Sequence, residues 1–442
     1  MTRVSRLPQD DATCGWYAML PPPAPARRLK GRESTDWAIL GAGLTGLAAA
    51  RCLAGHLPNA RIALIEAERV GFGASGRNSG FAIDLPHDVV HGRRRARDTL
   101  LEEQRRRRRL SQAGVAALRG LVGSHGIDCA WRELGKLHGA VEEGGLRALE
   151  DYARGLDALE APYEWLDQDR MQAVTGTGYY RKGLKTPGTA LMQPAALTRG
   201  LAASLPANVE LFEESPVIAW RIDEAIELEC ADGALVTKGL LLATNAFTPA
   251  IGFLKDRFFP VFTFSSLTRP LSRDEQAALG GEPEWGLIAG DRLGTTVRRT
   301  GDQRILIRNT FLYAPRLHFG EGELARLGEL HRRSFGARFP MLGEVAFDYS
   351  WGGALCMSSN HALFFGALAP GIFAAVGCNG AGVAMGTISG ALLADYVVGA
   401  ESELLRDIRA LPRPKRLPPK PFLGLGVGLT LKRRERRAGK EF

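Results

Sequence analysis

The spacing of apolar residues near the start of the chain predicts a strand, a helix and a second strand in close succession. Residues 37–40 form a short apolar run, residues 44–56 carry apolar and small side chains at helical spacing, and residues 61–66 form a second apolar run. Strands joined by so short a helical connection run parallel, with a right-handed crossover. We therefore expect a β-α-β unit over residues 37–66, preceded by an irregular arm at residues 1–35.

Further along the chain the apolar pattern alternates between helical and strand-like segments. Fully apolar runs at residues 238–244 and 371–377 are typical of strands buried in a parallel sheet. Between residues 257 and 312, strand-like segments separated by Gly and Asp turns indicate an antiparallel sheet. Shorter strands are predicted at 209–211, 217–222 and 226–230, and helices at 98–122, 145–160, 164–174, 321–336 and 383–398.

Nucleotide-fold segments at both ends and in the middle of the 442 residues indicate two interleaved domains. The predicted fold class is α/β (α+β), with a Rossmann-type nucleotide-binding domain interleaved with a substrate domain built on an antiparallel sheet flanked by helices. The predicted boundaries are 36–92, 188–256 and 345–400 for the first domain, 93–187 and 257–344 for the second, and 401–442 for a basic tail.

The composition is that of an ordinary globular protein, with 45% hydrophobic and 24% charged residues. No apolar run has the roughly 20 residues of a membrane-spanning helix, and the polar, proline-rich N-terminus lacks the apolar core of a secretory signal. The six cysteines have no paired spacing, which argues against a disulfide scaffold and against a zinc site. We expect a cytoplasmic protein without a metal.

The net charge of +9 is concentrated in two segments. Residues 93–109 hold nine arginines against three acids, and residues 413–442 hold ten basic residues against two acids. Binding to nucleic acid or to an anionic membrane would therefore depend on these segments alone. We expect no nucleic-acid partner, and we keep peripheral contact of the basic tail with the inner membrane face as an alternative to a simple solvated tail.

Gly41, Gly43 and Gly46 form a G-x-G-x-x-G pattern between the first strand and the helix. In that position the first glycine permits a tight turn, the second lets the backbone approach a pyrophosphate, and the third allows close helix–strand packing. The helix N-terminus then faces the phosphates. Glu66 ends the next strand, where it is placed to accept hydrogen bonds from ribose hydroxyls, which favours NAD or FAD over NADP.

A second glycine- and hydroxyl-rich loop, GFGASGRNSG, follows at residues 71–80 and carries one cation, Arg77. Such a loop can offer backbone amides and the hydroxyls of Ser75 and Ser79 to a pyrophosphate and a flavin. A plain NAD dehydrogenase has no need of this loop, so its presence favours FAD as the cofactor.

With these motifs the chain resembles the D-amino-acid oxidase-like family of FAD-dependent oxidoreductases, which includes glycine oxidase and sarcosine oxidase. Within that family it is most similar to the branch of gamma-glutamylputrescine oxidase and bacterial pipecolate oxidase. The resemblance is carried, in order, by GAGLTGLAAA (41–50), IEAERVGFGASGRNSG (65–80), ALMQPAALTRGLA (190–202), LLATNAF (241–247) and GCNGAGVAMGTISG (377–390).

The resemblance implies non-covalent FAD, with a helix N-terminus near residues 380–383 that would stabilise the negative charge of reduced flavin. Sarcosine oxidase has a substrate-binding lysine where this chain has Ala384, so that anchor is absent. Cys356 lies near the family's point of covalent flavin attachment, but a structural cysteine is the preferred interpretation. The predicted cofactor-binding residues are Gly41, Gly43, Leu44, Thr45, Gly46, Glu66, Ala67, Gly73, Ala74, Ser75, Arg77, Asn78, Ser79, Gly80, Val217 (near the adenine), Ala243, Thr244, Asn379, Gly380, Gly382, Val383 and Ala384.

An amine-oxidising flavoenzyme needs an oriented substrate and a dry pocket, so no catalytic triad is expected. The carboxylate of an amino-acid substrate would require a bidentate arginine. One candidate is Arg308, which interrupts an apolar strand. Another is Arg299, which corresponds to the arginine of glycine oxidase, although the adjacent Arg298 leaves the register open. The predicted pocket walls are Tyr313, Phe262 and Phe264.

We therefore predict oxidation of a primary or secondary amine or amino acid to an imine by hydride transfer to flavin N5, with reoxidation by oxygen or a quinone. A cyclic or N-substituted amino acid such as pipecolate is one substrate class. Three alternatives stay open: oxidation of a gamma-glutamyl polyamine, action on an aminomethyl group of tRNA with residues 93–109 contacting the RNA, and a non-catalytic flavoprotein. The identity of the amine, and the choice between oxidase and dehydrogenase, are not fixed by the sequence.

Overall fold

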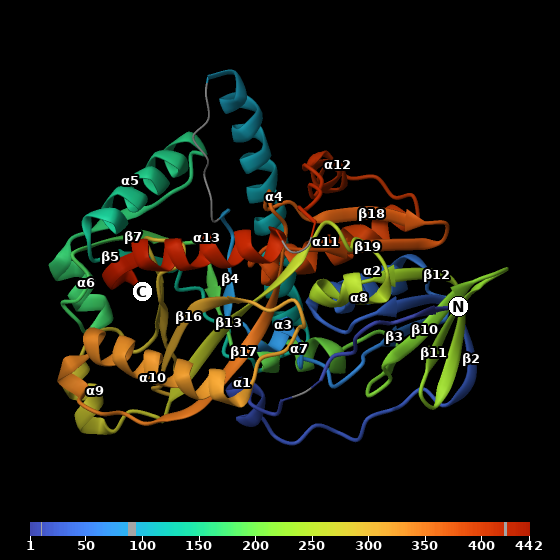
Figure 1. The fold of residues 1–442 in the computed structure, drawn as a ribbon, viewed down its shortest axis with the longest axis horizontal. Helices are drawn as coiled ribbons and strands as arrows, with labels where there is room; N and C mark the ends of the chain where they lie inside the picture. Colours follow the sequence, from blue (N-terminus) through green and yellow to red (C-terminus); the bar gives the residue numbers. More distant parts are fainter. Residues whose placement is uncertain (10, 87–93, 420–421) are drawn as a thin grey trace.

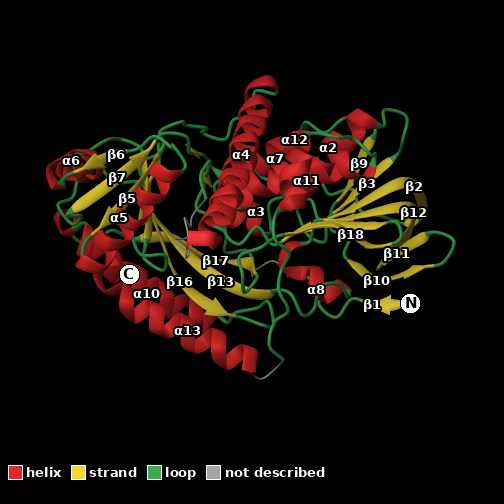
Figure 2. Cartoon of the chain, turned by 90° about the horizontal axis from the view of Figure 1, so that it is seen from above, coloured by secondary structure: helices red, strands yellow, loops and turns green. Residues whose placement is uncertain are grey.

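The computed structural model describes residues 1–9, 11–86, 94–419 and 422–442. The chain forms two halves, each built on one large β-sheet and covered by helices (Figure 1). Seen from above, helix α4 (Arg94–Ser124) stands between the two sheets (Figure 2).

The first sheet has nine strands, and its parallel part sets the position of the glycine turns. The parallel strands lie in the order β9 (Val209–Phe212), β3 (Ile62–Ile65), β2 (Gly31–Leu40), β12 (Gly233–Leu242) and β19 (Ile372–Val376). The antiparallel strands are β11 (Ile226–Cys230) beside β12, then β10 (Val217–Ile222) and β1 (Thr2–Arg3), with β18 (Phe364–Ala369) beside β19. The turns that follow the parallel strands therefore gather at one edge, where α/β proteins bind their ligands.

Glycine and other small residues let the helices pack closely over this sheet. Helices α2 (Leu44–His56) and α11 (Gly382–Val397) lie side by side, and α4 packs against α11. A Cβ atom at Gly390 would overlap the carbonyl oxygen of Thr45, and one at Gly114 would overlap that of Ala384, so only glycine permits these approaches. The apolar core between helices and sheet includes Ile39, Leu47, Leu110, Leu241 and Ile388.

The second sheet has eight strands and is antiparallel except where β14 meets β5. Its order is β17 (Phe347–Met357), β13 (Phe259–Thr268), β16 (Ile305–Tyr313), β15 (Thr296–Arg299), β14 (Trp285–Ala289), β5 (Lys136–Ala140), β7 (Lys182–Thr186) and β6 (Glu164–Leu166). The helices around it are α5 (Glu143–Ala158), α6 (Gln168–Thr175), α9 (Arg273–Leu279) and α10 (Glu321–Arg338).

Shorter elements complete the fold. Strands β4 (Phe81–Ala82) and β8 (Ala190–Leu191) form a two-stranded sheet. The remaining helices are α1 (Gly15–Ala18), α3 (Ala74–Arg77), α7 (Pro194–Ala203), α8 (Thr248–Ile251), α12 (Glu403–Ala410) and α13 (Phe422–Ala438), with 3-10 turns at Asn245–Phe247, Pro340–Leu342 and Gly439–Glu441. No helix among the described residues has the length and apolar character needed to cross a bilayer.

The predicted fold class is confirmed, and four segments differ in detail. Residues 1–35 are not wholly irregular, because β1 pairs with β10 and β2 already begins at Gly31. Residues 164–174 contain a strand and a helix, since the Asp167 side chain caps the N-terminus of α6. Strand β17, which the predicted boundaries gave to the Rossmann-type domain, pairs with β13 of the second sheet. The basic tail contains the two helices α12 and α13. The domain boundaries themselves stay a prediction.

Candidate active site

A cavity of about 1310 Å³ lies between the carboxyl ends of the parallel strands and the face of the second sheet. It exceeds the ~300–1,000 Å³ of most small-molecule pockets, so it has room for a dinucleotide and a second small molecule. Most of the predicted cofactor-binding residues line it: Gly41, Gly43, Leu44, Thr45, Glu66, Ala67, Gly73, Ala74, Ser75, Arg77, Asn78, Ser79, Val217, Ala243, Thr244, Asn379, Gly380, Gly382 and Val383.

The first glycine turn has the geometry that its sequence pattern predicts. Gly41 has a φ of 101°, in the left-handed region that favours glycine. A Cβ atom at Gly43 would lie 2.8 Å from the Ser75 hydroxyl oxygen, so the backbone there is closely approached. Gly46 does not line the cavity, because it is the residue that brings α2 against the turn: its Cβ would overlap the Gly41 carbonyl oxygen.

Glu66 lies at the end of β3, with its carboxylate against this turn. One carboxylate oxygen accepts a hydrogen bond from the Ala42 amide at 2.8 Å, and the other accepts a longer one from the Glu68 amide at 3.3 Å. Burial raises the pKa of Glu66, while these backbone amides act to lower it. The carboxylate is therefore fixed at the cavity wall with acceptor capacity remaining.

The 71–80 loop is tied to the first turn and closed on itself. The Ser75 hydroxyl oxygen accepts a hydrogen bond from the Leu44 amide at 2.9 Å. The Asn78 side chain donates to the Ser75 carbonyl at 2.7 Å and accepts from the Gly80 amide at 2.8 Å. Gly80 faces the second sheet instead of the cavity, because the buried Arg298 guanidinium donates to its carbonyl oxygen at 3.2 Å.

Arg77, the one cation of this loop, is already paired. Its guanidinium donates to Asp11 of the N-terminal arm at 2.7 Å and to the Gly352 carbonyl at 3.0 Å. Burial acts to raise the pKa of Asp11, but the hydrogen bond and charge of Arg77 lower it overall. Arg77 therefore holds the loop to the arm and to β17. Asp11, 66 residues away, is a partner that the sequence pattern did not reveal.

The turn before α11 supplies the third part of the cavity wall. The Asn379 side chain donates to the Gly377 carbonyl at 2.6 Å and accepts from the Ser358 amide at 2.8 Å, so it shapes this turn. The N-terminus of α11 then opens on the cavity. Ala384, predicted as a cofactor contact, is buried away from the cavity, because its backbone packs against Gly114 of α4.

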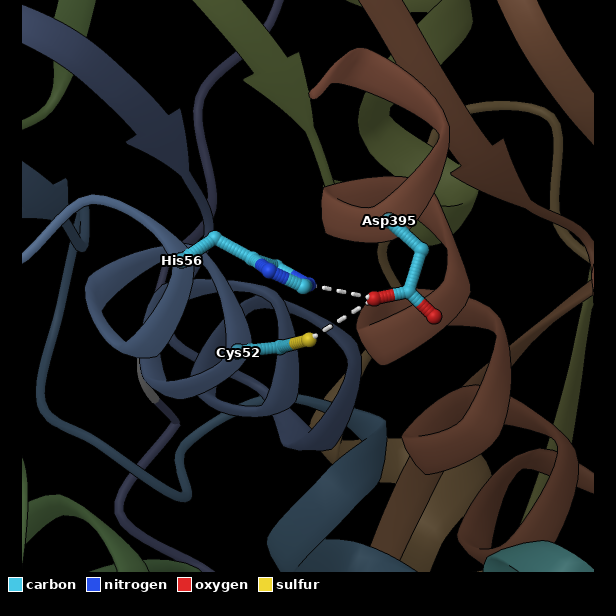
Figure 3. Close-up of side chains that lie close together, drawn as sticks. All are labelled: Cys52, His56 and Asp395. Carbon is cyan, nitrogen blue, oxygen red and sulfur yellow. Dashed lines mark hydrogen bonds and ion pairs between the residues drawn. The ribbon is translucent and has the colours of Figure 1, made fainter. Parts of the chain in front are cut away.

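A polar cluster joins the two helices whose N-termini reach the cavity (Figure 3). Cys52 and His56 of α2 both contact Oδ1 of Asp395 on α11, at 3.3 and 2.7 Å. These three could supply metal ligands, with ligand atoms within 4.8 Å of one another. Burial raises the pKa of Cys52 to about 12, with the Asp395 carboxylate acting in the same direction. The two contacts to the Asp395 carboxylate tie α2 to α11.

Arg308 of β16 lies in the cavity wall and has no acidic partner among the described residues. Its guanidinium instead makes a cation–π contact with Phe311, 5.4 Å from the centre of the ring. Burial lowers its pKa to about 10, so the side chain stays protonated at neutral pH. Thr296 and Ser265 lie opposite Arg308 on the neighbouring strands and also line the cavity.

A bulge in β16 places Phe311 beside Arg308. Residues 308 and 311 would point to opposite faces of a regular strand, because side chains alternate. Thr310, with a φ of 57°, is an extra residue between the pairs Asn309–Phe264 and Phe311–Thr263. The bulge restores Phe311 to the cavity face, an arrangement that the sequence pattern did not predict.

The other predicted substrate residues divide between the cavity and the core. Arg299 does not line the cavity; it points to the opposite face of β15 and donates to the Gly280 carbonyl at 2.7 Å and to the Gln303 side chain at 2.8 Å. Tyr313 packs edge-on against Phe259 outside the cavity lining. Phe262 lines the cavity, whereas Phe264 is fully buried in the core.

The arginine run at residues 105–109 is largely paired within the chain; of the preceding residues, 87–93 and the side chains of 94–97 lie outside the description. Arg109 makes two hydrogen bonds of 2.7 and 2.8 Å to the buried Asp407 of α12, and Arg106 lies 3.6 Å from the same carboxylate. Arg107 pairs with Glu103 at 2.8 Å. These arginines therefore hold α4 to α12 and stabilise the helix itself.

Comparison with known proteins adds a family and several relatives. The family model described as "DAO: FAD dependent oxidoreductase" matches residues 36–396. The chain is 26% identical to a probable oxidoreductase OrdL from Haemophilus influenzae, over 84% of this chain and 85% of that protein. It is also 26% identical to gamma-glutamylputrescine oxidoreductase from Escherichia coli, over 85% and 86%. Among solved structures, glycine oxidase from Geobacillus kaustophilus superimposes with a TM-score of 0.68 at 20% identity, covering 84% of this chain and 96% of that one.

Proposed function

Because the chain belongs to the DAO family of FAD-dependent oxidoreductases, we propose that it binds FAD non-covalently in the large cavity and oxidises an amine that carries a carboxylate. Its relatives include oxidoreductases and dehydrogenases of amines and amino acids. The observation that carries the proposal is Arg308, a cation in the cavity wall without an acidic partner among the described residues. A substrate carboxylate would supply the missing charge.

The first-sheet end of the cavity has the groups that an FAD molecule requires. The α2 N-terminus, approached closely at Gly43, suits the pyrophosphate. The Glu66 carboxylate suits the ribose hydroxyls, and Val217 at the start of β10 suits the adenine. The N-terminus of the 16-residue helix α11 suits the flavin pyrimidine, where reduced flavin carries negative charge.

FAD, when bound, supplies the two-electron acceptor for oxidation of an amine to an imine by hydride transfer to N5, with regeneration by oxygen or a quinone. The protein residues bind and orient the substrate. Arg308 would hold the carboxylate, and the aromatic rings of Phe262 and Phe311 would keep water from the reacting carbon.

Within this class we favour a cyclic or N-substituted amino acid, since the Arg308 guanidinium in the cavity wall matches a carboxylate beside the amine. A gamma-glutamyl polyamine is the second candidate, in keeping with the name of the Escherichia coli relative. Action on tRNA is less favoured, because Arg106, Arg107 and Arg109 already pair with acids of this chain.

Cys356 supports non-covalent attachment. This cysteine lines the cavity but is 2% exposed, and burial raises the pKa of its thiol well above the usual value. A protonated thiol is a poor nucleophile toward a flavin. Mass spectrometry of the denatured protein should therefore show no added flavin mass.

We also propose that helix α13 contacts a membrane peripherally and that a quinone in this membrane accepts the electrons. The outward face of α13 exposes Leu425 and Leu429, 63% and 68% accessible, next to the basic residues Arg433 and Arg436. An apolar stripe beside a basic cluster suits contact with an anionic lipid surface, where a quinone would be available as acceptor.

The decisive experiment is an anaerobic screen of the flavin-loaded protein against amino acids, N-methyl amino acids and polyamine derivatives. Loss of flavin absorbance near 450 nm with a carboxylated amine, restored in air or by a quinone, is the expected result. A bound flavin that no amine reduces would instead favour a non-catalytic flavoprotein.

A further inference from the structure

Helix α13 presents one whole face to the cavity. The lining residues recur every three to four positions along the helix: Phe422, Leu423, Gly426, Val427, Thr430, Leu431, Arg434 and Arg437. This spacing is that of a single helical face. In Figure 1 the helix crosses in front of strands of the second sheet, and it contacts β16 and α5. The family match ends at residue 396, so the helix lies outside it.

The chain is fastened to the body on both sides of this helix. Before it, the Leu417 amide donates to the Asp256 carbonyl at 2.8 Å. After it, the buried Glu441 side chain accepts from the Val141 amide at 2.7 Å, and Arg338 donates to the Glu441 carbonyl at 3.0 Å. The inner face of α13 is therefore held as a wall of the cavity.

The segment that follows α13 closes the edge of the second sheet at which β15 begins. The Thr295 amide donates to the Glu441 carbonyl at 2.8 Å, and the next residue, Thr296, is the strand partner of Arg308. Arg437 and Arg434 precede Glu441 by about one and two helical turns, respectively. Arg308, Arg434 and Arg437 all line the same large cavity.

Positive charge exceeds negative charge in this part of the cavity. Leaving aside Arg292, which has an interaction of its own, three arginines that line this region, Arg308, Arg434 and Arg437, stand against Asp151 and Asp291. Asp151 already pairs with Arg154, and Asp291 accepts from the Leu293 amide at 2.9 Å. Neither Arg434 nor Arg437 has an ion pair with a described residue.

We propose that Arg434 and Arg437 form a second anion subsite, so that the substrate is an amine bearing two acidic groups. This inference rests on the proposed function, which assigns the first carboxylate to Arg308. The helix residues bind the distal acid, and the carbon chain between the two acids spans the cavity beneath α13.

The test compares acids that cannot be oxidised. Isothermal titration calorimetry on the purified holoprotein measures binding of glutarate, a five-carbon diacid, and of valerate, a five-carbon monoacid. We expect glutarate to bind about tenfold more tightly, and we expect R434A/R437A to reduce this preference to less than about threefold. The double variant R433A/R436A is the matched control, because it removes the same charge from the outward face of the same helix.

The outcomes separate this inference from the proposed function. If valerate binding depends on Arg308 but glutarate binds no more tightly, the second subsite is refuted while the proposed function stands. Equal loss of the preference in both double variants also refutes it, since that result indicates general charge. If the preference for glutarate depends on Arg434 and Arg437 but R308L leaves valerate binding unchanged, the proposed role of Arg308 in carboxylate binding is refuted instead. Absence of binding by either acid contradicts both.

Discussion

The Ser75 hydroxyl oxygen accepts a hydrogen bond from the Leu44 backbone amide at 2.9 Å. This bond joins the 71–80 loop to the first residue of α2, so the two glycine-rich segments form one continuous wall. The same hydroxyl lies where a side chain on Gly43 would collide with it. Ser75 therefore positions the backbone that the proposed pyrophosphate would contact.

Ser75→Ala should weaken flavin binding without unfolding the protein. The substitution leaves the Leu44 amide without its acceptor, and one such bond contributes about 1 kcal/mol, or roughly a fivefold change in Kd. The measurement is the flavin-to-protein absorbance ratio after dialysis. Ser389→Ala is the control, because that hydroxyl donates within α11 at 3.1 Å and does not line the cavity. Equal flavin loss in both variants would contradict the role given to Ser75.

Replacing Arg308 with Leu should weaken substrate binding while making the protein more stable. The half-buried Arg308 guanidinium has no acidic partner among the described residues and is only partly hydrated in the cavity wall, so removing it should raise the Tm. Loss of a charge partner at a desolvated site typically costs ~2–5 kcal/mol of binding, so KM should rise by about 30-fold or more. Arg299→Leu is the opposite case, since it strips partners from the Gly280 and Glu282 carbonyls and should lower the Tm. A lower Tm for R308L would argue that Arg308 is structural.

The cofactor-facing glycines could be predicted because their signal is local. A strand, a turn and a helix within thirty residues leave few arrangements, and Gly41, Gly43 and Glu66 follow from spacing alone. Arg77 could be assigned to the loop, but its ion-pair partner could not be predicted. That partner, Asp11, lies in the N-terminal arm, whose sequence shows no recognisable motif. The helical face of α13 was present in the sequence, but its alternating glycines hid the periodicity.

The substrate-binding residues of the second sheet were harder to predict, because the face to which each side chain points depends on strand register. Arg298 and Arg299 are adjacent, so one residue of slip exchanges the faces to which they point. The structure turns Arg298 toward Gly80 and Arg299 toward Gln303. Arg308 could be identified from the sequence, because a charged residue inside an apolar strand is energetically unfavourable and therefore indicates a specific role. The bulge at Thr310, which brings Phe311 to its side, has no comparable signal.

The outward face of α13 should bind anionic vesicles if it contacts a membrane. Co-sedimentation with vesicles of mixed neutral and anionic lipid should retain the protein at low salt and release it as salt screens Arg433 and Arg436. L425S/L429S should reduce the bound fraction several-fold, because it removes the two most exposed leucines of this face. Binding that is equal for neutral and anionic vesicles, or unchanged in the variant, would contradict the contact.

Lys136 should make stability depend on pH in the alkaline range. The side chain is 1% exposed on β5 and donates to the Tyr152 hydroxyl at 3.4 Å, and burial lowers the pKa of Lys136 to about 8, with Asp84 acting in the opposite direction. In the unfolded chain the same ammonium titrates near 10.5. Between these values the unfolded state holds the extra proton, so the free energy of unfolding should rise as the pH is raised from about 8 to about 10.5. Below pH 8 the destabilisation caused by burying the charged ammonium is fully present, at about 3 kcal/mol.

Lys136→Met should remove this destabilisation, so the free energy of unfolding measured in urea at pH 7 should be higher for the variant than for the wild type. The difference should shrink toward pH 10. The exposed Lys238→Met serves as the control with no such trend, and parallel curves for K136M and wild type would show that Lys136 titrates normally.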